Sequence, residues 1–381
     1  MKKVDLLYFD AGGGHRAAAN ALSQVIAAQQ RPWDVRLINL QEVLDPLDIF
    51  RKITGLRLQD IYNLLLRKGW TLGSPQLMRM MHGVIRIYHP AQVRLLEKFW
   101  RSEQPDLVVS AVPNFNRALY ESLRRASPKT PYVTVLTDFA DYPPHFWIER
   151  QPQYLICGTE RAAAQARDLG HEDAHIFQTS GMILAPRFYE TVEIDRRAER
   201  QKLGLDPDLP TALVLFGGHG SRAMLEIARL LDRSGLKLQL ILICGRNEAL
   251  AADLRKMPRQ IPMFVETFTA EVPYYMRLAD FFIGKPGPGS ISEALAMRLP
   301  ALVERNAWTL PQERYNAEWI VEKQVGLVLR SFRYIVPAVA ELMQPENYRR
   351  FRANAAAVNN RAVFEIPDIL EKILTTCEVH S

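Results

Sequence analysis

Cysteine is scarce in this 381-residue chain, and its three copies follow no pattern. Cys157, Cys244 and Cys377 are odd in number and lie far apart in the sequence. Disulfide frameworks and cysteine-based metal sites need paired or closely spaced cysteines, so the sequence excludes both. This usage is typical of a reduced cytosolic protein.

Long hydrophobic runs are missing as well. A helix needs about 20 consecutive apolar residues to span a bilayer, and no stretch of the sequence approaches that length. After Met1 to Lys3 a short apolar run leads straight into three glycines, less than the roughly 7–15 apolar residues of a secretory signal. We therefore expect a first β-strand there, and neither a signal peptide nor an integral membrane protein. Hydrophobic residues at 48% and charged residues at 24% indicate an ordinary globular chain of two or three domains.

Acidic residues are scarce in one segment. Between Pro46 and Arg101 ten Lys or Arg residues stand against three acidic ones, whereas the rest of the chain is close to neutral. A basic excess confined to one segment indicates an anionic partner, either lipid headgroups or nucleic acid. Aliphatic residues at helical spacing accompany these charges, with Trp70 and Trp100 near the expected helix ends. We therefore expect residues 46–101 to contact an anionic membrane surface and not nucleic acid. Core helices with a solvated basic face are the competing interpretation.

Short apolar runs alternate with helix-like segments along both halves of the sequence. The expected strands of the first half are 4–9, 35–40, 107–111, 132–136 and 154–157. Those of the second half are 212–216, 237–244, 280–283 and 300–303, and residues 346–377 are expected to be helical. This alternation predicts an α/β protein with parallel sheets. We expect two doubly wound halves, 1–195 and 196–345, with ligands in the crevice between them and helices of 346–381 packed back on the first half.

The turn from Gly12 to His15 follows the first expected strand and opens a helix. Glycines there allow a ligand close to the backbone, and a helix N-terminus favours negative charge. The pattern differs from Gly-x-Gly-x-x-Gly, which disfavours a nicotinamide site. His15 is the titratable group of this turn that suits proton transfer near neutral pH, although capping of a structural turn explains it too.

The second half holds two more glycine-rich turns. The amides of Gly217 to Ser221 suit a diphosphate, although a plain strand-to-helix turn is the alternative. The turn from Lys285 to Glu293 is more specific, since it delivers Ser290 into the first turn of a helix. The carboxylate of Glu293 can accept two hydrogen bonds from a ribose diol there, whereas the competing interpretation is ordinary helix capping.

Together with Gln312-Glu313 and Asn316, these turns resemble the donor-sugar signature of family 28 glycosyltransferases. Within that family the most similar members are the monogalactosyldiacylglycerol synthases, on the evidence of residues 12–17, 243–247, 285–289 and 312–316. The resemblance covers roughly residues 4–330. It implies two Rossmann-like domains that face each other across a cleft, the GT-B glycosyltransferase clamshell.

The resemblance also implies roles on the donor side. The donor would be a UDP-sugar, with its uracil at the backbone of Phe268 and Thr269 and its ribose at Glu293. The groups expected to face the diphosphate are amides and hydroxyls of the glycine-rich turns: Gly218, His219, Gly220, Ser221, Gly287, Gly289 and Ser290. Those expected to face the sugar hydroxyls are Gln312, Glu313 and Asn316. Neither a cofactor nor a metal is implied, because helix N-termini and loop amides would neutralise the leaving diphosphate.

On the acceptor side, the resemblance implies that His15 is the general base of one in-line displacement, which inverts the anomeric carbon. Asp138 is the second catalytic candidate. The other residues expected on the acceptor side are Gly13, Gly14, His145 and Trp147. The loop that carries Asp138 and His145 is stretched by Tyr142-Pro143-Pro144 relative to the family pattern. Both residues have an alternative role as strand-end turn residues with a structural hydrogen bond.

The expected function is therefore transfer of a hexose, galactose or glucose, from a UDP-sugar to diacylglycerol or a similar membrane lipid. The enzyme would be cytoplasmic and peripherally associated with the inner face of the cell membrane. One alternative is a polyprenyl-linked or other non-glyceride acceptor. Another is a UDP-sugar 2-epimerase on the same clamshell, which would not need the basic amphipathic segment.

Overall fold

The computed structural model describes residues 1–10, 13–47 and 74–379. Its N-terminal half is a parallel six-stranded sheet in the order β2-β1-β3-β4-β5-β6. The strands are β1 (Lys2–Tyr8), β2 (Trp33–Asn39), β3 (Leu107–Ser110), β4 (Tyr132–Val135), β5 (Tyr154–Cys157) and β6 (Ile176–Gln178). The helices of this half are α1 (Gly14–Ala28), α2 (Leu40–Leu44), α5 (Ser74–Glu103), α6 (Asn116–Ala126) and α7 (Glu160–Asp168).

The C-terminal half is a second parallel six-stranded sheet, in the order β12-β11-β10-β7-β8-β9. Its strands are β7 (Thr211–Leu215), β8 (Gln239–Ile243), β9 (Met263–Glu266), β10 (Phe281–Gly284), β11 (Ala301–Glu304) and β12 (Gly326–Leu329). The helices are α8 (Arg196–Lys202), α9 (Ala223–Asp232), α10 (Glu248–Lys256), α11 (Val272–Leu278), α12 (Pro288–Ala296), α13 (Arg314–Glu322), α14 (Ile335–Leu342), α15 (Pro345–Ala357) and α16 (Ala362–Val379). The α/β prediction with two parallel sheets is confirmed.

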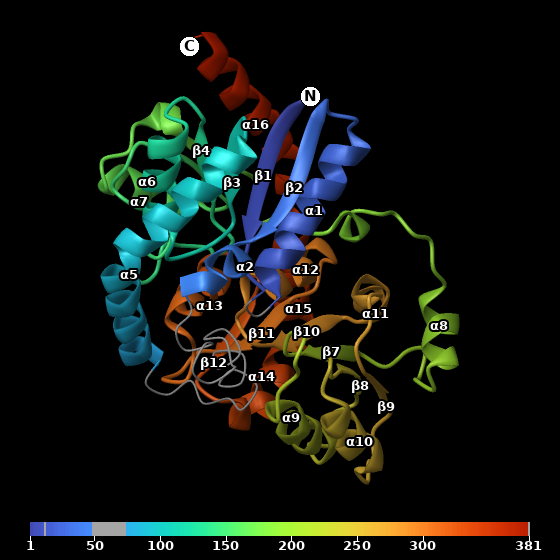
Figure 1. Ribbon diagram of the computed structural model, residues 1–381. Coiled ribbons are helices and arrows are strands. Elements are labelled where there is room, and N and C mark those ends of the chain that lie inside the picture. Colours follow the sequence, from blue (N-terminus) through green and yellow to red (C-terminus); the bar gives the residue numbers. More distant parts are fainter. Residues whose placement is uncertain (11–12, 48–73, 380–381) are drawn as a thin grey trace.

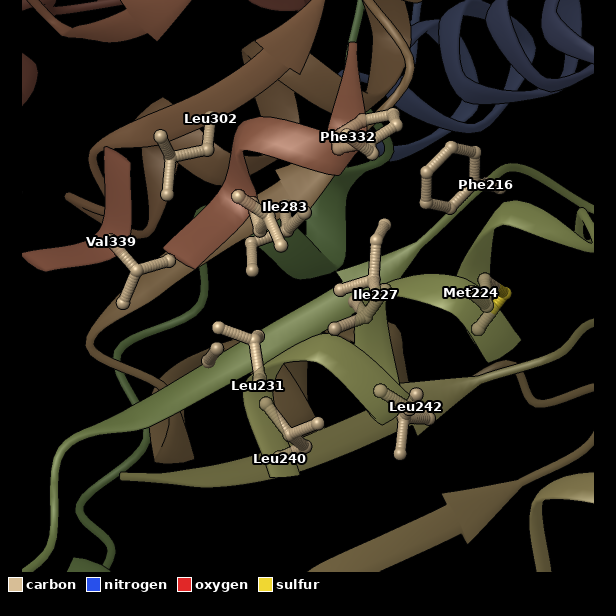
Figure 2. Close-up of a cluster of buried hydrophobic side chains, with 14 of the residues drawn as sticks. Phe216, Met224, Ile227, Leu231, Leu240, Leu242, Ile283, Leu302, Phe332 and Val339 are labelled. Carbon is tan, nitrogen blue, oxygen red and sulfur yellow. The ribbon is translucent and has the colours of Figure 1, made fainter. Parts of the chain in front are cut away.

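Apolar strands buried on both faces form the centre of each half, as parallel sheets require. Every residue of β3, β4, β7, β8 and β10 is buried. In the C-terminal half, side chains of β7, β8 and β10 pack against α9 and α14 (Figure 2). The labelled residues of this cluster are Phe216, Met224, Ile227, Leu231, Leu240, Leu242, Ile283, Leu302, Phe332 and Val339.

The chain crosses between the two halves twice. Figure 1 shows the two sheets as separate lobes, with both chain ends and α16 at the lobe of the N-terminal sheet. Helix α16 packs on α1 and adds Ile366 and Leu370 to the core of the N-terminal sheet. Helix α15 contacts α12 and α14 of the second half. Phe139 and Met182 of the first half also belong to an apolar cluster of the second.

The strand order reverses between β1 and β3 in the first sheet and between β7 and β10 in the second. Ligands of open α/β sheets bind beyond the carboxyl ends of the strands at such points. The turn at His15 follows β1, Gly217 follows β7, and Lys285 follows β10. The three glycine-rich turns are therefore at the positions where this topology binds ligands.

Three short strands were not anticipated from the sequence: β6, β9 and β12. Each has only three or four residues, and none is buried along its whole length. Strand β12 also begins at Gly326, where a Cβ would overlap the carbonyl oxygen of Ala301. A glycine weakens the sequence signal of a strand, and here close approach of the neighbouring backbone requires it.

Part of the basic segment 46–101 belongs to the long helix α5, and residues 48–73, including Trp70, lie outside the described part of the chain. The second half of α5 packs into the core through Val93, Leu96 and Trp100. Trp100 is fully buried, and its indole N–H donates to Ser122 Oγ at 2.9 Å. The expectation that Trp100 contacts a membrane surface is therefore wrong, because this indole satisfies its polar atom inside the protein. Along the described ranges, no helix has both the length and the apolar character needed to cross a membrane.

Candidate active site

The first turn of α1 brings His15 to the carboxyl edge of the N-terminal sheet. Gly13 precedes the helix with a φ of 82°, a left-handed conformation that glycine adopts without strain. No described side chain caps this helix end, so the amides of the first turn remain available to a ligand. Gly13 and Gly14 are both exposed, as close approach of an acceptor molecule to this turn requires.

The imidazole of His15 is held by the loop that follows β4. Its Nδ1 lies 3.0 Å from Thr137 Oγ1, and its ring centroid lies 5.7 Å from that of Trp147. Burial lowers the pKa of His15 to about 4, and a hydrogen bond with the Ala111 backbone only partly opposes this. The imidazole is therefore neutral at physiological pH, the state in which it can accept a proton.

Asp138 is the second titratable group of this loop. Its Oδ2 accepts a 2.9 Å hydrogen bond from the indole N–H of Trp147, whose side chain is fully buried. Burial raises the pKa of Asp138 to about 7, the Trp147 hydrogen bond lowers it, and the charges of Glu313 and Lys285 act with opposite signs. Trp147 thus contacts the His15 ring and donates a hydrogen bond to Asp138. The pKa of Asp138 is thus affected by charges from the other half of the protein.

Asp141, which the sequence reasoning passed over, organises the rest of this loop. One carboxylate oxygen accepts from the backbone N–H of Trp147 at 2.6 Å, and the other accepts from that of His145 at 3.0 Å. His145 is exposed, has a φ of +63°, and places its Nδ1 3.2 Å from the carbonyl oxygen of Ile148. An aspartate just before Tyr142-Pro143-Pro144 is a turn signal, and it was the available clue to this role.

Two glycine loops of the C-terminal sheet pack directly on each other. Gly220 has a φ of +62°, and a Cβ there would lie 2.5 Å from the carbonyl oxygen of Cys244. The Arg246 backbone N–H donates to the carbonyl oxygen of Gly218 at 2.9 Å. His219 and Ser221 of the same loop are partly exposed. Only glycine allows this approach, which sets the loop amides at the end of β7.

An exposed aromatic ring follows β9. Phe268 is 58% exposed, and the Arg246 guanidinium carbon lies 4.9 Å from its ring centroid. The neighbouring Thr269 Oγ1 accepts from the backbone N–H of Glu271 at 2.9 Å. A large exposed ring held by a cation offers a platform for a planar group such as a nucleobase.

The turn after β10 leads into α12 without a side-chain cap among the described residues. Gly287 precedes the helix, Gly289 is exposed, and Ser290 is partly exposed in its first turn. Burial raises the pKa of Glu293 to about 7, and the positive charge of Arg187 in the interdomain linker opposes the shift. A partly exposed carboxyl group beside an open helix N-terminus suits recognition of a diol and a diphosphate.

The turn before α13 carries the remaining donor candidates. Glu313 is buried, and its Oε1 lies 2.8 Å from Lys285 Nζ. Gln312 is partly exposed. Asn316 is fully buried, and its side-chain amide donates to the carbonyl oxygen of Pro286 at 2.9 Å. Asn316 therefore holds the loop after β10 from behind, whereas Glu313 and Gln312 lie nearer its open side.

Metal ligands are not grouped in this region. The described residues contain no cluster of three or more His, Cys, Asp or Glu side chains that could hold a metal ion. An Asp-x-Asp triplet occurs at Asp206-Pro207-Asp208, but Asp206 accepts backbone N–H groups of its own turn and Asp208 pairs with Arg197. A surface hollow of about 400 Å³ beside Arg196, Arg277 and neighbouring residues contains none of the candidates.

Two family models match the chain. The model for monogalactosyldiacylglycerol (MGDG) synthase matches residues 15–182, and the model for the C-terminal domain of family 28 glycosyltransferases matches residues 211–372. A probable MGDG synthase 2 of Oryza sativa subsp. japonica is 28% identical over 98% of this chain and 81% of its own length. The MGDG synthase of Spinacia oleracea is 27% identical over 98% of this chain and 73% of its own length.

Solved structures resemble the whole fold. The S. aureus MnaA–UDP structure has a TM-score of 0.64 at 15% identity and covers 98% of this chain and 97% of its own. Acinetobacter baumannii MurG has a TM-score of 0.64 at 13% identity and covers 98% of this chain and 100% of its own. Anabaena HepE in complex with UDP-glucose has a TM-score of 0.56 at 15% identity, covering 99% and 100%. These likenesses confirm the GT-B fold.

Proposed function

The chain is a family 28 glycosyltransferase that resembles the MGDG synthases, and on that premise we propose that it transfers galactose or glucose from a UDP-sugar to diacylglycerol or a similar membrane lipid. One observation carries the proposal. Phe139, next to Asp138, packs on Trp319 of α13 in the other half with ring centroids 4.9 Å apart, and the charges of Glu313 and Lys285 act on the Asp138 carboxyl group. This contact supports a site shared by the acceptor and donor groups that we assign to the two halves.

On the donor side, the backbone at Phe268 and Thr269 receives the uracil, and Glu293 accepts the ribose hydroxyls. The diphosphate lies at the N-terminus of α12 and against the amides of the loop that follows β7, where an anion is favoured. Gln312 and Glu313 face the sugar hydroxyls, while Asn316 holds the loop after β10 through its hydrogen bond to the carbonyl oxygen of Pro286. We propose this donor step without a cofactor or a metal, because helix and loop amides neutralise the charge.

The chemical step is one in-line displacement. Neutral His15 takes the proton of the acceptor hydroxyl while that oxygen attacks the anomeric carbon. The bond from this carbon to the β-phosphate oxygen breaks, and its electron pair leaves with UDP. Attack from the face opposite the diphosphate inverts the anomeric configuration. We assign Asp138 to the sugar side of this reaction, because the charges of Glu313 and Lys285 of the donor half act on its carboxyl group.

The acceptor comes from a membrane, which the enzyme approaches through its basic segment. Of residues 46–101 the structure describes α5, whose outer face exposes Arg86, Ile87, Arg94 and Lys98. Basic residues beside an exposed aliphatic side chain suit an anionic bilayer. We assign the enzyme to the inner face of the cell membrane as a peripheral protein of the cytoplasm.

A donor panel tests the proposal directly. Purified protein is incubated with UDP-galactose, UDP-glucose or UDP-N-acetylglucosamine and diacylglycerol vesicles, and lipid mass spectrometry identifies the product. We expect a monohexosyl diacylglycerol, and proton NMR should show a β-anomer from the α-linked donor. Absence of any glycolipid with every donor would refute the assigned acceptor.

The same incubations distinguish the two alternatives. Transfer to a polyprenyl phosphate but not to diacylglycerol would identify a non-glyceride acceptor. Conversion of UDP-N-acetylglucosamine to its 2-epimer without any lipid would identify an epimerase. We expect neither reaction.

A further inference from the structure

Lys285 has no role in the step described so far, yet it lies between the loop that begins at Gly217 and the loop that contains Gly287. It directly follows β10, which is the neighbour of β7 at the point where the strand order reverses. Its Cε lies 3.7 Å from the position a Cβ would take on Gly217 and 3.4 Å from that position on Gly287. The lysine stem thus crosses the mouths of both loops, and its ammonium is 3.8 Å from the Cβ position of Gly287.

The carboxylate of Glu313 contacts the ammonium. Lys285 Nζ lies 2.8 Å from Glu313 Oε1, and the side chains are 40% and 10% exposed respectively. The pKa of Asp138 is raised by the charge of Glu313 and lowered by the charge of Lys285. The positive charge of Lys285 therefore compensates the negative charge of the mostly buried Glu313. Lys285 itself is exposed enough for a ligand to contact its ammonium.

We propose that Lys285 is a catalytic residue of the donor site, whose ammonium exchanges Glu313 for the diphosphate of a bound nucleoside diphosphate sugar. This inference rests on the function proposed above. A diphosphate at the N-terminus of α12 carries more negative charge than one carboxylate, and charge-assisted hydrogen bonds to phosphate are strong. The exchange also releases the Glu313 carboxylate, which then accepts hydroxyl hydrogens of the sugar.

The exchange gives the lysine a defined part in the reaction. When the anomeric carbon–oxygen bond breaks, its electron pair remains on the β-phosphate oxygen, where negative charge grows. The Lys285 ammonium neutralises that charge without giving up a proton, and the acceptor proton goes to His15. Stabilising charge that develops in the transition state is what raises the rate of the chemical step.

Calorimetric titrations of uridine, UMP and UDP separate this role from that of a structural clamp. The variants are Lys285→Met and Glu313→Gln, and Lys323→Met, an exposed lysine at the end of α13, is the matched control. We expect Lys285→Met to weaken UDP binding about ten-fold or more, the usual cost of losing a charge-assisted hydrogen bond, and to leave uridine binding unchanged. Glu313→Gln should bind UDP as tightly as the native protein or more tightly, while turnover falls.

The two members of the ion pair thus move UDP affinity differently, which a purely structural pair would not do. Equal weakening by both variants, with uridine binding lost in parallel, would overturn the proposal. Lys285→Arg should retain most of the UDP affinity, since guanidinium also binds phosphate. If the native protein binds neither uridine nor UDP, the proposed function fails. If it binds both and Lys285→Met behaves like Lys323→Met, only the inference about Lys285 fails.

Discussion

At His15 and Glu293, burial favours the neutral form of the side chain. The same desolvation lowers the pKa of the imidazole to about 4 and raises the pKa of the carboxyl group to about 7. One group is therefore ready to accept a proton at neutral pH, and the other changes charge near it. Residue type alone predicts neither value, because both depend on what surrounds the side chain.

Replacing His15 tests its role as general base. We expect His15→Ala to lower turnover about 10²–10⁴-fold, the range for losing a positioned base, while UDP affinity measured by calorimetry stays unchanged. Because only the neutral imidazole accepts a proton, the dependence on His15 should disappear only as the pH falls through about 4. A near-normal rate for the variant would assign His15 to helix capping.

Glu293 should make nucleoside binding depend on pH. A carboxylate accepts the two ribose hydroxyl hydrogens and a carboxylic acid does not, so uridine affinity should rise as the pH increases through about 7. Uridine is the suitable probe because it carries no phosphate to titrate. Glu293→Gln should abolish this pH dependence and weaken UDP binding about ten-fold. Uridine affinity that is flat from pH 6 to 8 in the native protein would contradict the ribose assignment.

Among the elements, helices α1 and α12 begin in the same way. Each follows a central strand, begins after a glycine, and has no described side chain at its cap. Ordinary helices use Ser, Thr, Asp or Asn at that position. Leaving it open costs some helix stability and keeps the first amides available to a ligand. This shared feature explains why the glycine-rich turns were the strongest signals in the sequence.

Helix α16 should contribute strongly to stability, because it completes the core of a sheet more than 180 residues before it in the sequence. Leu370 is fully buried in that core. We expect Leu370→Ala to lower the free energy of unfolding by about 2–5 kcal/mol, measured by urea denaturation. Thr375→Ala on the exposed face of α16 is the control and should cost at most about 0.5 kcal/mol. A Leu370→Ala variant as stable as the control would show that α16 is dispensable.

At the scale of the whole molecule, the return of α16 ties the two halves together, and an apolar cluster with Phe139 joins them near the site. The rings of Phe139 and Trp319 meet edge to face with centroids 4.9 Å apart. The proposed donor and acceptor residues therefore lie on two halves that this contact holds together. The membrane surface, in contrast, is assigned to the first half only.

Charge reversal in the basic segment tests that assignment. Arg51, Lys52, Arg67 and Lys68 changed together to Glu should abolish co-sedimentation with anionic vesicles, since each basic residue contributes about 1 kcal/mol near such a surface. UDP affinity should not change, because the proposed donor site is in the other half. Binding by the native protein should weaken with salt, as the Debye length falls from about 10 Å at 0.1 M to about 3 Å at 1 M.

The matched control reverses four exposed basic residues of the C-terminal half: Arg229, Arg233, Lys256 and Lys323. It changes the net charge equally and should still co-sediment. A quadruple variant of the basic segment that sediments like this control would mean that the segment is not the anchor.

The sequence by itself determined the α/β class, the three glycine-rich turns and nine of the twelve strands in the described part of the chain. These features are local: buried parallel strands are continuous apolar runs, and glycine marks close backbone approach. Only the tertiary structure decided that Trp100 is a core residue, that Asn316 lies behind the loop of Lys285, and that Asp138 responds to Glu313. Burial and long-range electrostatic interactions depend on which segments meet in space. The local sequence around a residue does not contain that information.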